Sequence, residues 1–220
     1  MEELNYAFFV DFDGTIAAID VCEALVTAFS RDGWQELNEK WEKKEISTLE
    51  CARQTFKLFK TSNPEDFLRL LDEVVIDPGF SDFAAYCRER NYPLTILSDG
   101  YDYYIEHILR REGLALPYCA NKLHFAPQLD VEAPYCSASC DLCGVCKLEL
   151  IEMQKKPGQM TVFIGDGYSD FCPAQGADLV FAKTRLYQHC QSVGKEAIHF
   201  NDFREVLLEF RKLSGEEGVK

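Results

Sequence analysis

A strand that ends in two carboxylates constrains this chain most strongly. The apolar residues 8–10 lead directly into Asp11, Phe12 and Asp13. Side chains alternate between the two faces of a strand, so Asp11 and Asp13 share a face while Phe12 points into the core. Two like charges at the end of a buried strand are unfavourable unless a divalent cation lies between them or one carboxyl is protonated. The motif therefore predicts a functional site at this strand end.

Two further strand ends carry polar residues. An apolar run at residues 162–164 precedes Asp166 and Asp170, and another run ends at Ser98 and Gly100. In a doubly wound sheet, ligands bind beyond the carboxyl ends of the strands. Together these ends offer a nucleophilic carboxylate, a hydroxyl and backbone N–H groups for phosphate oxygens, and carboxylates for a hard cation such as Mg²⁺.

The composition is that of a globular protein and narrows the choice of partners. Of 220 residues, 47% are hydrophobic, and 23 basic against 37 acidic residues give a formal net charge of −14. Nucleic acids and anionic membranes bind basic patches, so neither is expected as the main partner. No basic, apolar leader opens the sequence, and no apolar run reaches the roughly 18 residues that span a membrane. We expect a cytoplasmic monomer or homodimer that binds a small molecule.

The sequence patterns divide the chain into a core and an insertion. Residues 17–79 have helical patterns throughout, whereas strand and helix patterns alternate from residue 80 onward. Such alternation indicates a parallel sheet with helices on both faces. The prediction is an α/β fold: a Rossmann-like doubly wound parallel sheet core of residues 1–16 and 80–220, with a small helical cap of residues 17–79 inserted after the first strand.

Local signals place the individual elements. Polar residues that favour helix starts occur at three positions of the expected cap: Asp20, Ser47 and Asn63. Strands after the first are expected at 94–97, 122–125, 161–164, 179–181 and 197–199. Helices of the core are expected at 81–91, 101–112, 147–156, 170–176, 185–193 and 202–213.

The expected site needs a cation to hold a phosphate and to offset the charge of the nucleophile. Lys147 is the preferred candidate because it begins a helix just before the strand that leads to Asp166. The positive end of that helix would assist in binding an anion. Lys122, Lys155 and Lys156 are competing candidates, and a solvated surface lysine is the alternative interpretation.

Four motifs of this chain, taken in sequence order, resemble the four motifs of the haloacid dehalogenase superfamily of phosphatases. They are Asp-Phe-Asp-Gly-Thr from Asp11, the strand-terminal Ser98, Lys147, and Gly-Asp-Gly-Tyr-Ser-Asp from residue 165. The position of the cap, between the first two motifs, is similar to that of the phosphoserine-phosphatase-like branch. The cysteine-rich run before Lys147 and the segment 177–183 more specifically resemble the 2-hydroxy-3-keto-5-methylthiopentenyl-1-phosphate phosphatases of methionine salvage.

The resemblance implies a hydrolase that acts on a small phosphorylated metabolite. Asp11 would attack phosphorus to form an aspartyl-phosphate, which splits hydrolysis into two easier displacements. Asp13 would protonate the leaving oxygen and then activate water for the second displacement. The substrate implied by the finer resemblance is the enol-phosphate of methionine salvage.

The resemblance also implies a Mg²⁺ cofactor and a phosphate-binding set. The Asp11 carboxylate, the Asp13 backbone carbonyl and Asp166 would hold Mg²⁺, with Asp170 in support through water or the lysine. The phosphoryl oxygens would bind to a further set of groups, which supplies the positioning and charge that phosphoryl transfer needs: Ser98, Gly100 and Lys147.

Four cysteines fall within eleven residues just before Lys147. Cys136, Cys140, Cys143 and Cys146 could supply the four thiolates of a tetrahedral structural Zn²⁺ site. Free or disulfide-prone thiols are the main alternative, and an iron–sulfur cluster is a third interpretation. A structural Zn²⁺ would stiffen the loop that positions Lys147.

Polar residues of the expected cap are candidates for contact with the leaving group. They are Asp20, Glu23 and Arg53, and the spacing of Asp20 and Arg53 loosely resembles the amino-acid-recognising pair of phosphoserine phosphatases. An N-cap and a solvated helix face are the alternative interpretations. Asp99 departs from the small residue common after the serine in this branch, so it either faces away from phosphate or contacts a substrate hydroxyl. Three tyrosines could line the pocket or pack a helix: Tyr101, Tyr103 and Tyr104.

Other functions remain open from the sequence alone. A phosphoserine-phosphatase-like enzyme, another small-metabolite phosphatase or a phosphotransferase would use the same residues. A thiol-rich metal-binding module on an inactive scaffold is the non-enzyme alternative. Dehalogenation is disfavoured because the arrangement of Asp13 and Asp166 is that of phosphoryl chemistry.

Overall fold

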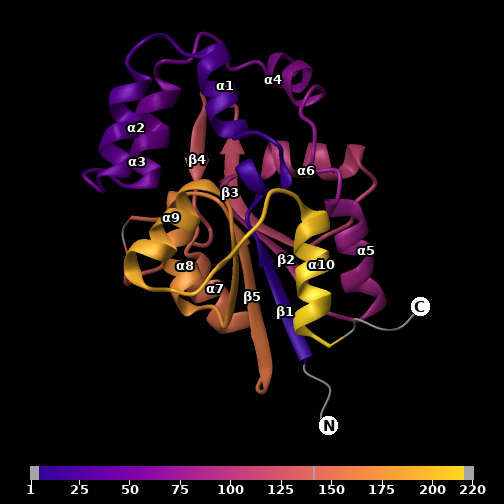
Figure 1. Ribbon diagram of the computed structural model, residues 1–220. Helices are drawn as coiled ribbons and strands as arrows, with labels where there is room; N and C mark the ends of the chain where they lie inside the picture. Colours follow the sequence, from indigo (N-terminus) through magenta and orange to yellow (C-terminus); the bar gives the residue numbers. More distant parts are fainter. Residues whose placement is uncertain (1–4, 141, 216–220) are drawn as a thin grey trace.

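The computed structural model describes residues 5–140 and 142–215. These residues form a seven-stranded sheet in the order β4-β3-β2-β1-β5-β6-β7, with β1 at the centre (Figure 1). All neighbouring strands pair in parallel except β4, which runs antiparallel to β3. The strands are β1 (Asn5–Val10), β2 (Leu94–Tyr101), β3 (Tyr118–His124), β4 (Asp130–Glu132), β5 (Gln159–Gly165), β6 (Leu179–Ala182) and β7 (Ile198–His199).

Helices cover both faces of this sheet, which confirms the predicted doubly wound α/β fold (Figure 1). One face packs against α5 (Phe80–Glu89), α6 (Asp102–Arg111) and α10 (Phe203–Leu213). The other face packs against α7 (Lys147–Gln154), α8 (Phe171–Gly176) and α9 (Thr184–Val193). In the parts of the chain that are described, no helix has both the length and the apolar character needed to cross a membrane.

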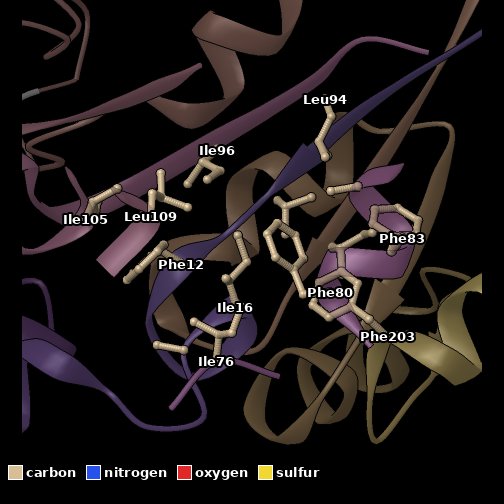
Figure 2. Close-up of a cluster of buried hydrophobic side chains, with 14 of the residues drawn as sticks. Phe12, Ile16, Ile76, Phe80, Phe83, Leu94, Ile96, Ile105, Leu109 and Phe203 are labelled. Atoms are coloured by element: carbon tan, nitrogen blue, oxygen red, sulfur yellow. The ribbon is translucent and has the colours of Figure 1, made fainter. Parts of the chain in front are cut away.

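The alternation of β1 divides its side chains between two hydrophobic cores. Phe8 lies in the core beneath α5 and α10, where its ring packs edge-on against Phe83 and Phe210 at centroid distances of 5.2 and 4.9 Å. Phe9, one residue later, lies in the opposite core. Phe12 extends the first core beyond the strand and is fully buried, as predicted (Figure 2). Aromatic packing of this kind fixes the strand whose end carries the two carboxylates.

Residues 17–79, here called the cap segment, hold four helices above the carboxyl ends of the strands (Figure 1). The three helix starts predicted in this segment are capped by side chains. Asp20 accepts a hydrogen bond from the Glu23 N–H at 2.8 Å, and Ser47 accepts one from the Glu50 N–H at 3.1 Å. The helices are α1 (Val21–Phe29), α2 (Trp34–Glu42), α3 (Thr48–Phe56) and α4 (Pro64–Leu71). An antiparallel bridge between Ala17 and Ile76 joins the two ends of the segment.

The observed elements differ from the sequence prediction chiefly on one side of the sheet. Strand β2 continues to Tyr101 instead of ending at residue 97, and β3 begins at Tyr118 instead of residue 122. Strand β4 was not predicted because three residues give too short an alternating pattern. It forms because Val131 is buried opposite Leu123 on β3. Helix α7 ends at Gln154, before the residue preceding a proline.

Candidate active site

The register of the central strands brings the predicted polar ends together. Val10, the last residue of β1, pairs with Ile96 of β2 on one side and Ile164 of β5 on the other. Asp11 and Asp166 therefore follow neighbouring strands at almost the same level. A parallel sheet in this register presents all of these side chains at one edge.

Lys147 connects the carboxylates at this edge. Its ammonium donates hydrogen bonds to Asp11 Oδ1 at 2.7 Å, Asp170 Oδ1 at 2.6 Å and Ser169 Oγ at 3.0 Å. The side chain extends from the first residue of α7 and is fully buried, with 2% exposure. The three competing lysines lie elsewhere: Lys122 pairs with Glu132 at 3.7 Å, Lys155 pairs with Glu152 at 2.6 Å, and Lys156 is exposed.

Three carboxylates form a group that could hold a metal ion. One oxygen from each of Asp11, Asp166 and Asp170 lies within 4.8 Å of the others, and the described residues contain no second group of this kind. The backbone fixes Asp170, whose Oδ2 accepts hydrogen bonds from the N–H groups of Asp166 and Gly167 at 2.9 and 3.1 Å. Oxygen donors at this spacing suit a hard divalent cation. One ammonium does not neutralise three carboxylates, so a bound divalent cation would be electrostatically favourable.

The electrostatics of the group follow from burial. Burial raises the pKa of Asp11 well above its usual value, and the charge of Asp170 raises it further against the opposing effect of Lys147. Burial and the charge of Asp170 likewise raise the pKa of Asp166 to about 6. Burial alone would lower the pKa of Lys147, but the adjacent carboxylates outweigh it and the net shift is upward. The lysine therefore stays charged, while the carboxylates need a proton or a cation.

Asp13 lies in a different environment from Asp11. Its Oδ1 accepts a hydrogen bond from the Val21 N–H at 3.0 Å, and its Oδ2 accepts from the Tyr104 hydroxyl at 2.5 Å and the Ser98 hydroxyl at 3.3 Å. Burial, and then the charge of Asp20, raise the pKa of Asp13 to about 7, although these hydrogen bonds oppose the shift. A carboxyl that exchanges a proton near neutral pH is suited to general acid–base chemistry.

The turn after β2 approaches Asp13 so closely that one position requires glycine. Ser98 is fully buried and accepts a hydrogen bond from the Gly100 N–H at 3.0 Å. A Cβ at Gly100 would lie 1.6 Å from the Tyr104 hydroxyl oxygen and 2.7 Å from Asp13 Oδ2. The absence of a side chain at Gly100 therefore allows the backbone to approach Asp13 and Tyr104.

A cavity of about 520 Å³ lies between this edge of the sheet and the cap segment. Its floor includes Asp11, Asp13, Gly100 and Asp166, and its walls mix polar and apolar groups. The apolar and aromatic lining comes mainly from the cap segment: Leu25, Val26, Trp34, Trp41, Phe56, Phe59 and Phe67. The cavity has room for a small organic molecule above the buried carboxylates.

A family model described as haloacid dehalogenase-like hydrolase matches residues 8–175, which include the two acidic strand ends and the lysine. The chain belongs to this hydrolase family. A 2-hydroxy-3-keto-5-methylthiopentenyl-1-phosphate phosphatase of Brevibacillus brevis is 31% identical over 213 residues, covering 94% of this chain and 96% of that protein. The protein of the same name from Geobacillus kaustophilus is 31% identical over 211 residues, covering 93% and 95%.

The fold of this hydrolase is similar to that of solved phosphoserine phosphatases. A substrate-bound phosphoserine phosphatase complex superposes with a TM-score of 0.72 at 20% identity, covering 94% of this chain and 99% of that one. A phospho-aspartyl intermediate analogue of phosphoserine phosphatase gives a TM-score of 0.70, with the same identity and coverage. At this level of identity, the likeness establishes the shared fold.

The three predicted cap contacts of this hydrolase do not lie together. Asp20 and Glu23, from the start of α1, line the cavity. Arg53 is not among the lining residues of that cavity; its guanidinium donates to Asp130 Oδ1 at 3.0 Å and to the Val131 carbonyl at 3.1 Å. Arg53 thus connects α3 to β4, the strand that the sequence did not predict.

Two other residues contact the central carboxylates without having been assigned a role from the sequence. Tyr104 donates to Asp13, and Ser169 accepts from Lys147. Tyr104 was left between pocket lining and helix packing in the sequence analysis, and the signal for its contact was its place in the first turn of the helix that follows Gly100. Thr15 also contacts the cluster, since its hydroxyl donates to Asp166 Oδ1 at 3.0 Å.

The structure does not support a zinc site in the cysteine run. All four of its cysteines are free and lie in the described part of the chain, where no three of their sulfurs come within 4.8 Å of one another. Burial, and then the charge of Asp99, raise the pKa of Cys143 to about 12, which favours a neutral thiol. Since zinc and iron–sulfur sites need converging thiolates, neither alternative finds support in this arrangement.

Proposed function

We propose that this chain is a Mg²⁺-dependent phosphomonoesterase that acts through an aspartyl-phosphate on Asp11. The proposal rests on one observation above all: a buried carboxylate, bonded to a buried lysine and beside two further aspartates, forms the floor of a cavity. A carboxylate oxygen of Asp11 would attack phosphorus as the bond to the leaving oxygen breaks. This chemistry needs little more than positioning and charge stabilisation, which the surrounding groups provide.

Asp13 is the proposed acid and base of this reaction. It would donate a proton to the leaving oxygen and later take one from the water that attacks the aspartyl-phosphate. The second displacement releases phosphate and restores the Asp11 carboxylate. A pKa of about 7 supports both roles, because each protonation state is populated near neutral pH.

The proposed metal ligands are oxygen atoms of this chain's own acidic residues. The carboxylates of Asp11 and Asp166 and the backbone carbonyl of Asp13 would hold Mg²⁺, with Asp170 in support through its bond to Lys147. When bound, Mg²⁺ would offset the negative charge of the carboxylates and of a phosphoryl group.

The proposed phosphate-binding groups come from the end of β2 and the start of α7. They are the Ser98 hydroxyl, the Gly100 N–H and the Lys147 ammonium. The Gly100 N–H donates a hydrogen bond to the Ser98 hydroxyl oxygen at 3.0 Å, and a phosphoryl oxygen would take the place of that hydroxyl as the acceptor. The Lys147 ammonium donates a hydrogen bond to the Asp11 carboxylate, and it would offset the negative charge of that carboxylate as phosphate approaches.

The substrate class follows from the relatives and the cavity together. The relatives are named as phosphatases of 2-hydroxy-3-keto-5-methylthiopentenyl-1-phosphate. We propose the same enol-phosphate as the substrate, with its apolar tail against the aromatic wall of the cavity. Phosphoserine is the main alternative, but Arg53, the expected partner of its carboxylate, is bonded to Asp130 outside this cavity. A cytoplasmic location and a monomeric or homodimeric state remain predictions.

A phosphate-release screen tests this function. The purified chain is assayed with Mg²⁺, with and without excess chelator, on the salvage enol-phosphate, phosphoserine, pyridoxal phosphate and phosphocholine. We expect Mg²⁺-dependent release that is fastest with the enol-phosphate. Phosphate transfer to an added alcohol in place of release would identify a phosphotransferase. Absence of release from every compound would contradict the proposal and favour an inactive scaffold.

A further inference from the structure

The phosphate-binding turn contains an acidic residue whose charge does not suit phosphate. Asp99 lies between Ser98 and Gly100 and is half-buried at the edge of the cavity. Its carboxylate would repel a phosphoryl group unless the charge were satisfied elsewhere. The contacts of Asp99 show how the charge is satisfied, and they involve two separate parts of the chain.

One oxygen of Asp99 bonds to the cap segment. The hydroxyl of Thr48, the first residue of α3, donates to Asp99 Oδ2 at 2.9 Å. The same hydroxyl accepts a hydrogen bond from the Trp41 indole N–H of α2 at 3.0 Å. A continuous chain of hydrogen bonds therefore runs from α2 through α3 to the phosphate-binding turn. Each bond strengthens the next because the final acceptor is charged.

The other oxygen of Asp99 bonds to the loop that carries the lysine. The Val145 N–H donates to Asp99 Oδ1 at 2.8 Å, two residues before Lys147. Asn121 on β3 supports the same turn, since its amide donates to the Asp99 carbonyl at 2.7 Å. The loop approaches so closely at Gly144 that a Cβ there would lie 2.8 Å from Asp99 Oδ1. One carboxylate thus holds the cap segment and the lysine loop at once.

We propose that Asp99 is a positioning residue that couples closure of the cap segment to the placement of Lys147. The proposal rests on the hydrolase function above and adds a role for a residue that contacts neither phosphorus nor metal. The bond from Thr48 holds the cap segment over the cavity, and the bond from Val145 holds the loop that aims the lysine at Asp11. Loss of the carboxylate weakens both attachments, whereas loss of the Thr48 hydroxyl weakens only that of the cap segment. The cap segment keeps its other contacts, which are the hydrogen bond from the Thr48 N–H to the Leu142 carbonyl and the pairs Arg53–Asp130 and Arg185–Glu42.

Four variants separate these effects. Thr48→Val removes the hydroxyl at nearly constant volume, and Thr48→Ser retains it. Asp99→Ala removes both acceptors. Thr61→Val is the matched control, because the Thr61 hydroxyl bonds to Asp66 within the cap segment, at 2.8 Å, and not to the core. For each variant we would measure kcat and KM with p-nitrophenyl phosphate, and amide hydrogen exchange of α3 without substrate.

The expected results differ in kind between the two sites. A hydrogen bond to a charged group shifts an opening equilibrium by roughly tenfold or more. Thr48→Val should therefore speed exchange in α3 about tenfold. It should raise KM by the fall in the closed fraction, which is at most the same factor, with kcat within about twofold of the parent because substrate still closes the cap segment. Asp99→Ala should show both effects and also lower kcat about tenfold or more, since the lysine loop loosens. Thr48→Ser and Thr61→Val should behave like the parent.

Three outcomes would overturn the proposal. The first is parental exchange and KM in Thr48→Val; the second is an equal change in Thr48→Val and Thr61→Val. The third is an Asp99→Ala variant whose kcat is unchanged, because the link to the lysine would then be wrong. If the parent chain released no phosphate, the proposed function would fail, yet hydrogen exchange would still decide whether the cap segment is held through Asp99.

Discussion

At the residue scale, Lys147 is the side chain on which the rest of the site depends. It is buried between Asp11 and Asp170, and an ammonium in such a place is tolerated only because two carboxylates satisfy it. The converse also holds, because without the lysine the aspartates would be buried without a compensating charge. The stability of these three buried side chains therefore depends on a single ammonium that compensates two carboxylates.

Replacement of this lysine should affect stability as well as turnover. We expect Lys147→Met to lower the free energy of unfolding by about 3–5 kcal/mol in metal-free buffer, because it leaves buried carboxylates unpaired. The loss should be larger at pH 8 than at pH 5, where the carboxylates take up protons. Urea unfolding at both pH values measures this change, and phosphate release should fall at least about 100-fold.

Lys195→Met provides the control for that experiment. Lys195 is half-buried and donates to the Ala177 carbonyl at 2.7 Å, and among the described residues no carboxylate lies within ion-pair distance of its ammonium, although its charge helps to lower the pKa of Asp178. Its replacement should cost about 1 kcal/mol and show little dependence on pH. Equal losses in the two variants would contradict the account of Lys147 as the compensating charge.

Asp13 should give the metal-free protein a distinctive dependence on pH. Its folded-state pKa of about 7 lies above the unfolded value near 3.8, so the folded state binds more protons between these limits. Stability must then fall as pH rises from about 4 to about 7. After allowance for partial exposure, the decline is of the order of 2 kcal/mol. The raised pKa of Lys147 acts above this window and does not interfere.

The Asp13→Asn variant isolates this contribution. Its amide keeps the shape of the protonated carboxyl but cannot ionise. Denaturant titrations from pH 4 to pH 7, with chelator present, should therefore show a smaller decline in stability than the parent shows. A variant whose profile runs parallel to that of the parent would mean that Asp13 does not hold a proton in the folded state.

At the element scale, the strand ends show what the sequence could predict. Asp11 and Asp166 were placed correctly because β1 and β5 are apolar, continuous and followed directly by their carboxylates. Because the two strands pair in parallel, the carboxylates that follow them must lie at the same edge of the sheet. Lys147 could be chosen because it begins a helix, although its contacts depend on the register of three strands.

Other features depend on tertiary contacts that no local pattern records. Strand β4 forms only because β3 is beside it, and Arg53 turns away from the cavity only because Asp130 lies on β4. The cysteine spacing permits a metal site. In the structure, however, the loop is held by the hydrogen bond from the Val145 N–H to Asp99, and the cysteine sulfurs do not converge on one point. In each case a partner distant in sequence decides the outcome.

The end of β2 offers a test of close packing at the element scale. Gly100→Ala would place a methyl group against the Tyr104 hydroxyl and Asp13. We expect the free energy of unfolding to fall by about 1–3 kcal/mol and phosphate release to be nearly lost, because the turn must move away from Asp13. Gly167→Ala is the control for stability, since a Cβ there meets no atom within 4 Å. Equal stability of the two variants would show that the turn adapts without strain.

At the scale of the whole molecule, the cap segment and the sheet form the cavity together. Beyond the contacts of Thr48, Arg185 of α9 pairs with Glu42 of α2 at 2.8 Å and stacks on the Tyr168 ring at 4.8 Å. Glu42, Tyr168 and Arg185 line the cavity, as Asp99 does. A substrate would therefore be enclosed by two parts of the chain that meet around it, which excludes water from the buried carboxylates.

The central claim is that Asp11 carries the phosphoryl group between the two displacements. The most direct measurement is acid quenching of the enzyme during turnover of a phosphomonoester, followed by mass analysis of the peptide that contains Asp11. We predict one added phosphoryl group on Asp11 in the parent, and neither this adduct nor turnover in a folded Asp11→Asn variant. Sustained phosphate release by Asp11→Asn, or a phosphoryl group on another residue, would contradict the account.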